Sequence, residues 1–206
     1  MKKTPGFTLI ELLVVIAIIG ILMSLLFPAV NGVMQAAQKA KAKNDVVQLA
    51  IAVKAYETEY GKLPTMIVSE NEKYSATEGW FQGPQTAAGS SHYNSEIVRV
   101  LTGEDYNGLN PRKIVFLEGR TAKGTPEKPK DGIAADGMFY DPWGTPYAIK
   151  MDTTYSDALE YYDPNQKINF RTTVIVISFG PNTIQQDTSK TVDSSGRKVD
   201  DIVSFQ

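Results

Sequence analysis

The beginning of the chain is almost continuously apolar and predicts a long helix. Of the 24 residues from Phe7 to Val30, 19 are apolar, and Glu11 carries the one charge. No ionisable side chain occurs between Leu12 and Gln38. About 20 mostly apolar residues suffice for a helix to cross the ~30 Å hydrocarbon core of a bilayer. The lysines at positions 2 and 3 lie before this stretch, so residues 7–30 are predicted to be a single span with a cytoplasmic N-terminus.

Residues 31–60 continue the helix with an amphipathic pattern. The apolar positions follow one another at steps of three and four, as on one helix face; they are Val46, Leu49, Ala50, Val53, Tyr56 and Tyr60. The charged positions are predicted to lie on the opposite, solvent-facing side; they are Lys39, Lys41, Lys43, Asp45, Lys54, Glu57 and Glu59. Gly61 and Pro64 predict the end of the helix at Tyr60. Pro28 lacks an N–H and predicts a kink or local melting.

Residues 61–139 show little regularity and form a variable α/β-loop insertion. The sequence predicts a loop over 79–91 and a short helix over 96–101, capped by Asn94 or Ser95. It also predicts a buried run over 114–117 and a second loop over 123–131, which contains two prolines.

Residues 140–206 have a β pattern. A turn over 141–146 precedes strands predicted at 147–151, 170–179 and 202–205, with an exposed connection over the acidic stretch 152–163. Three or four antiparallel strands packed on the apolar helix stripe would bury both elements. The predicted fold class is therefore α+β, and Trp143 is interpreted as a packing residue.

Composition excludes several classes of site. The chain has 206 residues, no Cys and one His, which rules out disulfides, thiolate metal sites and a Cys nucleophile. The net charge is −2, from 21 basic and 23 acidic residues, without the basic excess that nucleic-acid binding needs. A phosphate-binding glycine loop is missing from the sequence, and His92 is interpreted as a surface residue, so the chain is predicted not to be an enzyme.

Glu11 stands out within the apolar stretch. A carboxylate inside a membrane costs roughly 2.5–3.5 kcal/mol on insertion scales, so a functional partner is expected for it. A plain signal anchor, the simplest alternative, does not explain the acid.

The residues around Glu11 suggest its role. The sequence Lys-Lys-Thr-Pro-Gly-Phe-Thr-Leu-Ile-Glu at positions 2–11 resembles the N-terminal signal of the type IV pilin and pseudopilin family. The resemblance implies that residues 1–6 are a leader, that a membrane peptidase cuts after Gly6, and that Phe7 becomes the N-methylated terminus. It also implies the type IV pilin-like fold, with Glu11 as the acidic fifth mature residue and Pro28 as the helix-interrupting proline of many pilins.

The spacing then suggests how copies assemble. Phe7 and Glu11 are four residues apart, or roughly 6 Å along a helix. The free amine of Phe7 in one copy can therefore meet Glu11 of a neighbour offset by about one turn, which satisfies a charge that is costly alone. Because such a staggered contact does not close on itself, it generates a helical filament.

The C-terminal part narrows the resemblance. Tyr-Asp-Pro-Trp-Gly-Thr-Pro-Tyr at 140–147, Ser-Phe-Gly-Pro-Asn at 178–182 and Asp-Asp-Ile-Val-Ser-Phe at 200–205 are similar to segments of the major pseudopilins of type II secretion systems. This resemblance implies a periplasmic pseudopilus and a C-terminal loop that binds Ca²⁺. By family position, Asp200 and Asp201 are the first candidate ligands, followed by Asp187 and Asn182.

The calcium hypothesis has an equally open alternative. Oxygen ligands suit Ca²⁺, but the segment 182–201 has no EF-hand spacing. It contains Lys190, Arg197 and Lys198, and Asn182 stands where the family usually has an acid. A solvated loop whose acids are balanced by these cations explains the same residues.

Taken together, the sequence predicts a structural pseudopilin of a type II secretion system. The implied partners are further copies in a filament, other pseudopilins, a prepilin peptidase/methyltransferase, the inner-membrane assembly platform and the inner membrane, with no nucleic acid. The implied location is the bacterial inner membrane with a periplasmic head, and then the pseudopilus. The alternatives are a type IV pilus subunit for adhesion, motility or DNA uptake, and an uncleaved membrane-anchored periplasmic binding protein.

Overall fold

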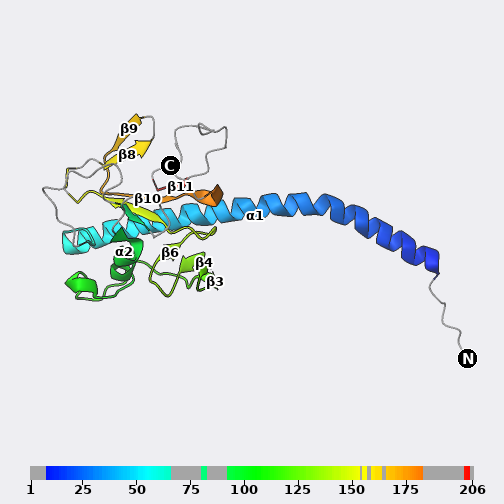
Figure 1. Cartoon of the computed structure of the whole chain (residues 1–206), viewed down its shortest axis with the longest axis horizontal. Coiled ribbons are helices and arrows are strands. Elements are labelled where there is room, and N and C mark those ends of the chain that lie inside the picture. Colours follow the sequence, from blue (N-terminus) through cyan, green and yellow to red (C-terminus); the bar gives the residue numbers. More distant parts are fainter. Residues whose placement is uncertain are drawn as a thin grey trace, which may run out of the picture. The chain divides into compact units, whose positions relative to one another are not determined.

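A computed structural model describes residues 8–65, 80–82, 92–153, 155–156, 159–163, 166–182 and 202–204. The chain divides into two units, residues 1–40 and residues 41–206, and each is considered by itself (Figure 1). The helix α1 contributes its first part to unit one and its second part to unit two, which we call the head.

The helix α1 spans Leu9–Tyr60, 52 residues, close to the predicted range. It ends where expected, because Gly61 has a φ of +68°, a left-handed conformation that glycine adopts without strain. Of the two outcomes predicted at Pro28, a kink or local melting, the melting is wrong, since the helix is unbroken there. A proline removes one hydrogen bond, and the neighbouring turns keep theirs.

The head is built on a five-stranded sheet with the order β11-β10-β7-β1-β2. These strands are Ile202–Val203, Val174–Ser178, Ala148–Met151, Trp80–Gln82 and His92–Tyr93. Neighbouring strands are antiparallel except β1 and β2, which are parallel. The α+β prediction is confirmed, and the sheet has one strand more than the largest number expected. Of the two strands that were not predicted, β1 lies within the range predicted as a loop and β2 directly follows it; runs of two or three residues are too short to show a period.

The remaining elements surround this sheet. The helix α2, Asn94–Leu101, confirms the short predicted helix, and η1, Tyr106–Gly108, and η2, Gly180–Asn182, are single 3₁₀ turns. Three two-stranded hairpins complete the head: β3 (Lys123–Thr125) with β4 (Lys128–Lys130), β5 (Gly132–Ile133) with β6 (Phe139–Tyr140), and β8 (Leu159–Asp163) with β9 (Gln166–Phe170).

Three local predictions were wrong. The range 123–131 is a hairpin, because Pro129 lies in an edge strand of a two-stranded pair, where prolines are tolerated. The acidic connection over 152–163 contains strand β8. The run 114–117 is not uniformly buried: Leu117 is buried, but Val115 is 58% exposed.

Helix α1 packs on the head through the predicted stripe. Val46, Leu49, Val53 and Tyr56 are fully buried, and they share one core with α2 and the sheet. In β10, Val174 and Val176 belong to this core, whereas Ile175 and Ile177 belong to a second cluster with Leu159, Phe179 and Val203. Side chains alternate across a strand, so the sheet is covered on both faces.

The packing predicts a strong contrast between two positions of α1. Leu49 is fully buried and Ile51 is 60% exposed. Leu49→Ala should lower the free energy of unfolding by about 2–5 kcal/mol, because it removes buried methyl groups and leaves a cavity. Ile51→Ala, the matched control, should change it by less than about 0.5 kcal/mol. Urea unfolding of both variants in detergent micelles, followed by tryptophan fluorescence, measures the difference; equal losses would contradict the assigned packing face.

Candidate functional site

The first candidate site is the N-terminal turn of α1. The carboxylate of Glu11 accepts hydrogen bonds from the backbone N–H of Thr8 at 2.8 Å and from its hydroxyl at 2.6 Å. The backbone N–H of Glu11 donates back to the hydroxyl of Thr8 at 3.4 Å. This is a capping box, in which a threonine and an acid three residues later satisfy the free N–H groups of a helix start. Sequence reasoning missed it, although the Thr-x-x-Glu spacing was visible.

The helix beyond this turn exposes apolar side chains on all sides. Leu9 is 81% exposed, Val33 is 70% exposed, and the large residues between them for which exposure is described are about half exposed or more. Exposure on this scale is unusual for a soluble surface and marks an interaction site. Among the described residues, none of the helices meets the length and apolarity criteria for a membrane span.

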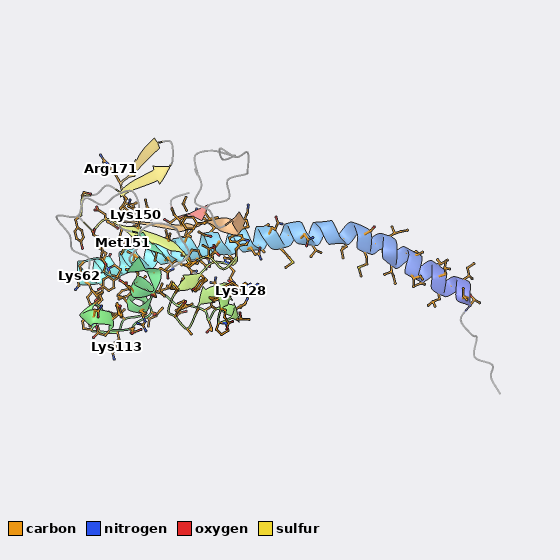
Figure 2. The ribbon with its side chains drawn as sticks, viewed as in Figure 1. Lys62, Lys113, Lys128, Lys150, Met151 and Arg171 are labelled. Atoms are coloured by element: carbon orange, nitrogen blue, oxygen red, sulfur yellow. The ribbon has the colours of Figure 1, made fainter. Side chains whose placement is uncertain are left out.

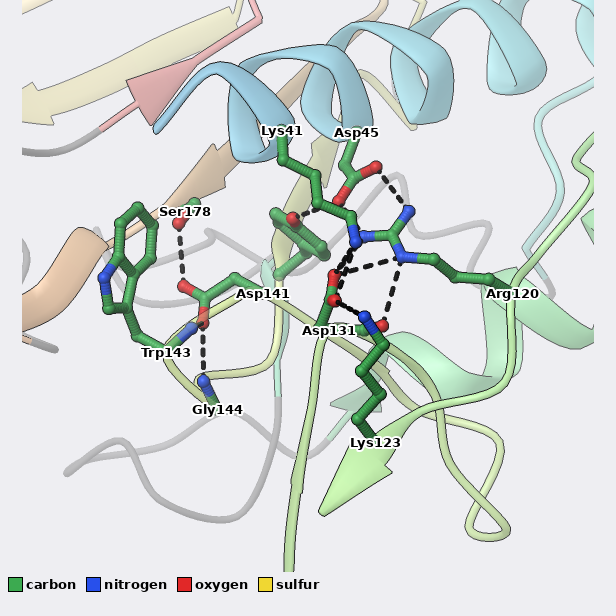
Figure 3. A network of polar contacts seen from close by, with 10 residues as sticks. Lys41, Asp45, Arg120, Lys123, Asp131, Asp141, Trp143, Gly144 and Ser178 are labelled. Carbon is green, nitrogen blue, oxygen red and sulfur yellow. Dashed lines mark hydrogen bonds and ion pairs between the residues drawn. The ribbon is translucent and has the colours of Figure 1, made fainter. Parts of the chain in front are cut away.

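The second candidate site is a polar network between α1 and the head. Asp45 is only 1% exposed, and the guanidinium of Arg120 donates to both of its carboxylate oxygens (Figure 3). The hydroxyl of Tyr147 donates to the same carboxylate at 2.7 Å. The solvent-facing assignment of Asp45 was therefore wrong. Its spacing to Ala42, Leu49 and Ala52 places it on the buried face, and its charge obscured that pattern.

Asp131 is the second acid of the network and binds three cations. Its carboxylate oxygens form ion pairs with the ammonium of Lys41 at 2.6 Å, the guanidinium of Arg120 at 2.9 Å and the ammonium of Lys123 at 3.0 Å. Burial alone would raise the pKa of Asp131, but these hydrogen bonds outweigh it and hold the pKa at about 2. Its backbone φ is +59°, so the chain adopts an uncommon conformation to place this carboxylate. Lys41 was predicted to face solvent, but its ammonium group pairs with Asp131.

Asp141 organises the Asp-Pro-Trp-Gly turn from within. One carboxylate oxygen accepts the backbone N–H groups of Trp143, Gly144 and Thr145 at 3.0, 2.9 and 2.9 Å. The other accepts the hydroxyl of Ser178 at 2.7 Å, which ties the turn to β10 (Figure 3). Asp141 is completely buried. Burial raises its pKa to about 6, against the lowering effect of these hydrogen bonds.

The turn forms one wall of a cleft. The cleft has a volume of about 660 Å³ and lies between β3–β4 and residues 140–145, with Trp143 among its lining residues. Trp143 is half-buried, so it has both a packing contact and an exposed surface.

The predicted processing and metal residues fall mostly outside the described part. Gly6, Phe7, Asp187, Asp200 and Asp201 are not among the described residues, and Asn182 ends η2. Within the described residues, no three or more acidic or histidine side chains gather as a metal site would require. His92 lies in β2.

Comparison with known proteins identifies the family. Residues 1–27 match the prokaryotic N-terminal methylation motif. A protein of Aeromonas hydrophila named type II secretion system core protein G is 41% identical over 148 residues, covering 72% of this chain and 73% of the relative. The protein of that name from Vibrio cholerae is 40% identical over 136 residues, covering 66% of this chain and 91% of the relative. The chain belongs to the family of type II secretion system core protein G.

A third member of the core protein G family, from Escherichia coli, is 36% identical over 114 residues, covering 53% of this chain and 74% of the relative. No solved structure matches. The predicted resemblance to the type IV pilin and pseudopilin family, and within it to the major pseudopilins of type II secretion systems, is therefore confirmed. Cleavage after Gly6 and the role of Glu11 stay predictions.

The raised pKa of Asp141 predicts an unusual pH dependence. The folded state holds this proton up to about pH 6, whereas the unfolded chain releases it near its ordinary pKa of 3.8. Stability contributed by Asp141 should therefore fall as the pH rises from about 4 to 6, because the folded state binds more protons in that range. Asp141→Asn keeps an acceptor for the three N–H groups and cannot ionise. Urea unfolding midpoints at pH 4, 5, 6 and 7 should show that the stability of the variant relative to the wild type increases as the pH rises. Parallel pH dependences of the two midpoints would contradict burial of a titrating Asp141.

Proposed function

We propose that this chain is the structural subunit of a type II secretion pseudopilus, cut by a prepilin peptidase after Gly6 and polymerised through α1. The observation that carries the proposal is the acid at the start of an exposed apolar helix, in a member of the core protein G family. A helix of this kind needs apolar partners along its whole length. Copies of the same helix in a filament supply them, and lipid does so before assembly.

The location follows from the same helix. Residues 7–30 anchor the subunit in the inner membrane as a single span, with the head in the periplasm. The subunit then leaves the bilayer as it joins the pseudopilus. Its other partners are further pseudopilins, the prepilin peptidase/methyltransferase and the assembly platform. Its role is structural and not enzymatic.

The capping box refines how Glu11 acts. In the single chain its carboxylate already holds Thr8, so the charge is partly satisfied before any neighbour arrives. A carboxylate has about four lone-pair sites, and the two bonds from Thr8 leave room for a neighbour's amine. Glu11 thus closes its own helix and pairs with the next subunit at the same time.

Processing gives the first prediction. Mass spectrometry of the chain purified from its native membrane should show a mature protein that begins at Phe7 with one added methyl group. The reason is that the N-terminal methylation motif spans the Gly6–Phe7 bond. An uncut N-terminus would favour a permanently anchored periplasmic protein instead.

Glu11 gives the second prediction, in which two substitutions separate charge from capping. Glutamine at this position of a capping box can make the same local hydrogen bonds, whereas leucine cannot. Because pairing with an amine needs the negative charge, Glu11→Gln and Glu11→Leu should both reduce filament yield by about tenfold or more, with membrane insertion intact. Sheared-filament yield and membrane fractionation measure the two properties.

Thr8→Ala is the control for the local contact. It removes the hydroxyl bond and keeps the backbone N–H bond to Glu11, so filament yield should stay within a few-fold of the wild type. Normal assembly of Glu11→Gln would show that capping is the acid's whole role and would refute intersubunit pairing.

We further propose that the segment between β10 and β11 binds Ca²⁺ through Asp200 and Asp201, with Asp187 and Asn182 as additional ligands. Supporting this, Ser178 pairs with Ile202, so the two ends of the segment meet at one edge of the sheet. A loop closed in this way is a suitable scaffold for oxygen ligands, and a bound ion would neutralise neighbouring carboxylates there.

Calcium removal gives the third prediction. The melting temperature of the purified chain should be several degrees higher in about 1 mM Ca²⁺ than in EGTA. The reason is that an ion that binds only the folded state stabilises it by mass action. Asp200→Asn with Asp201→Asn should abolish the difference. The control Asp105→Asn, at an exposed acid elsewhere in the head, should preserve it. Identical melting with and without EGTA in the wild type would rule the site out.

A further inference from the structure

Three lysines lie on one face of the β3–β4 hairpin. In the register of this hairpin Lys123 lies directly opposite Lys130, and Thr125 lies opposite Lys128. Cross-strand partners share a face, as do residues two apart along a strand, so the three lysines belong to the same face. All three are exposed. We call the surface formed by Lys123, Lys128 and Lys130 the lysine face.

The lysine face has little counter-charge of its own. Like charges directly opposite one another destabilise a strand pair, and Lys123 and Lys130 are such a pair. Asp131 pairs with Lys123 at 3.0 Å. Lys128 and Lys130 have no ion-pair partner among the residues that the structure describes. The segment 120–130 contains four basic residues and one acid, so an anionic partner would stabilise the hairpin.

An indole ring lies beside the lysine face. Trp143 is half-buried and lines the same cleft as Lys128 and Lys130. Its turn packs closely on β4, since a Cβ added at Gly144 would lie 3.2 Å from the carbonyl oxygen of Pro129. Indole rings combine an apolar body with one N–H group and are enriched at the level of lipid headgroups. Lysines around a tryptophan therefore suit a surface that is anionic and partly apolar.

The lysine face lies at the end of the head where α1 enters it. Asp131 pairs with both Lys123 and Lys41, and Lys41 is the first residue of the head (Figure 3). Figure 2 shows Lys128 at this end of the head and Lys113 at the opposite end.

The proposed anchor keeps this end of the head close to lipid. Residues 7–30 form the proposed span, and Lys41 follows Val30 by eleven residues. Eleven residues of helix rise about 16 Å, of which the headgroup layer takes up roughly 5–7 Å. The distance that remains is comparable with the Debye length of about 8–10 Å. Charged lipids therefore act on lysines at this end of the head.

We propose that the lysine face binds anionic phospholipid headgroups of the inner membrane before the subunit joins a filament, with Trp143 at the headgroup level. This inference rests on the proposed function, since it concerns the membrane-anchored subunit. Residues 41–206 contain 18 basic and 22 acidic residues, so an anionic surface repels the head as a whole. The lysine face then determines which end of the head meets the lipid.

The absence of native cysteine allows a fluorophore to be placed at one chosen position. The full chain with Thr125→Cys is labelled and reconstituted as single copies into nanodiscs of phosphatidylcholine, with or without about 30% phosphatidylglycerol. Energy transfer from the label to an acceptor attached to lipid headgroups should be about twofold higher with phosphatidylglycerol, and about 0.5 M NaCl should abolish the increase. A label at Lys113→Cys, at the opposite end of the head, should show no increase.

Two charge-matched pairs of substitutions identify the lysines responsible. In the labelled Thr125→Cys chain, Lys128→Gln with Lys130→Gln should remove the increase caused by phosphatidylglycerol, because each lysine near an anionic membrane strengthens binding about fivefold. Lys62→Gln with Lys113→Gln lowers the net charge equally at the opposite end of the head and should preserve the increase. All four lysines are exposed, so both variants are expected to fold.

The outcomes separate this inference from the proposed function. An increase at Thr125 that requires phosphatidylglycerol, low salt and both Lys128 and Lys130 supports lipid binding. Equal transfer in the two kinds of disc, or an increase that survives Lys128→Gln with Lys130→Gln, overturns it and leaves the pseudopilin function intact. Equal transfer together with a low filament yield of that variant would assign the lysines to an acidic neighbouring subunit instead. If the native chain is neither inserted in membranes nor found in filaments, both proposals are overturned.

Discussion

The ion pair between the buried carboxylate of Asp45 and the partly exposed guanidinium of Arg120 is the interaction on which the head depends. An isolated carboxylate at 1% exposure would be severely destabilising, so Asp45 requires its cation and the hydroxyl of Tyr147. Arg120 in turn binds Asp131, and Asp131 binds Lys41 and Lys123. Residues far apart in sequence are thereby fixed at one side of α1. Apolar packing buries the stripe of α1, and the network joins the same face of the helix to residues 120 and 131.

The sequence predicted the elements whose pattern is strong and missed those whose pattern is short. Helix α1, helix α2 and strands β7 and β10 followed from periodicity, turn residues and β-branched runs. The parallel pairing of β1 with β2 depends on contacts between segments that carry no local signal. Pro129 and the surrounding charges suggested a loop, because residue propensities disfavour proline in strands. An edge strand of a two-stranded hairpin nevertheless tolerates a proline.

The candidate site shows the same division. Glu11 could be singled out because an acid in an apolar run is anomalous by itself, and its role in assembly stays a prediction. Asp45 and Asp141 were not recognised, since a buried acid has the same local appearance as a surface acid until its partners are known. Those partners, Arg120 and Ser178, lie 75 and 37 residues away. The family resemblance indicated that the Asp-Pro-Trp-Gly segment mattered, and the structure supplies a physical reason, which is an acid that holds its own turn.

The capping box at the start of α1 also bears on the kinetics of growth. Because starting a helix is the costly step of helix formation, an uncapped first turn would fray. Thr8 and Glu11 close this turn within the single chain, so an incoming subunit arrives with its end already ordered. In the proposed filament, the addition of a subunit would therefore not have to wait for this first turn to fold.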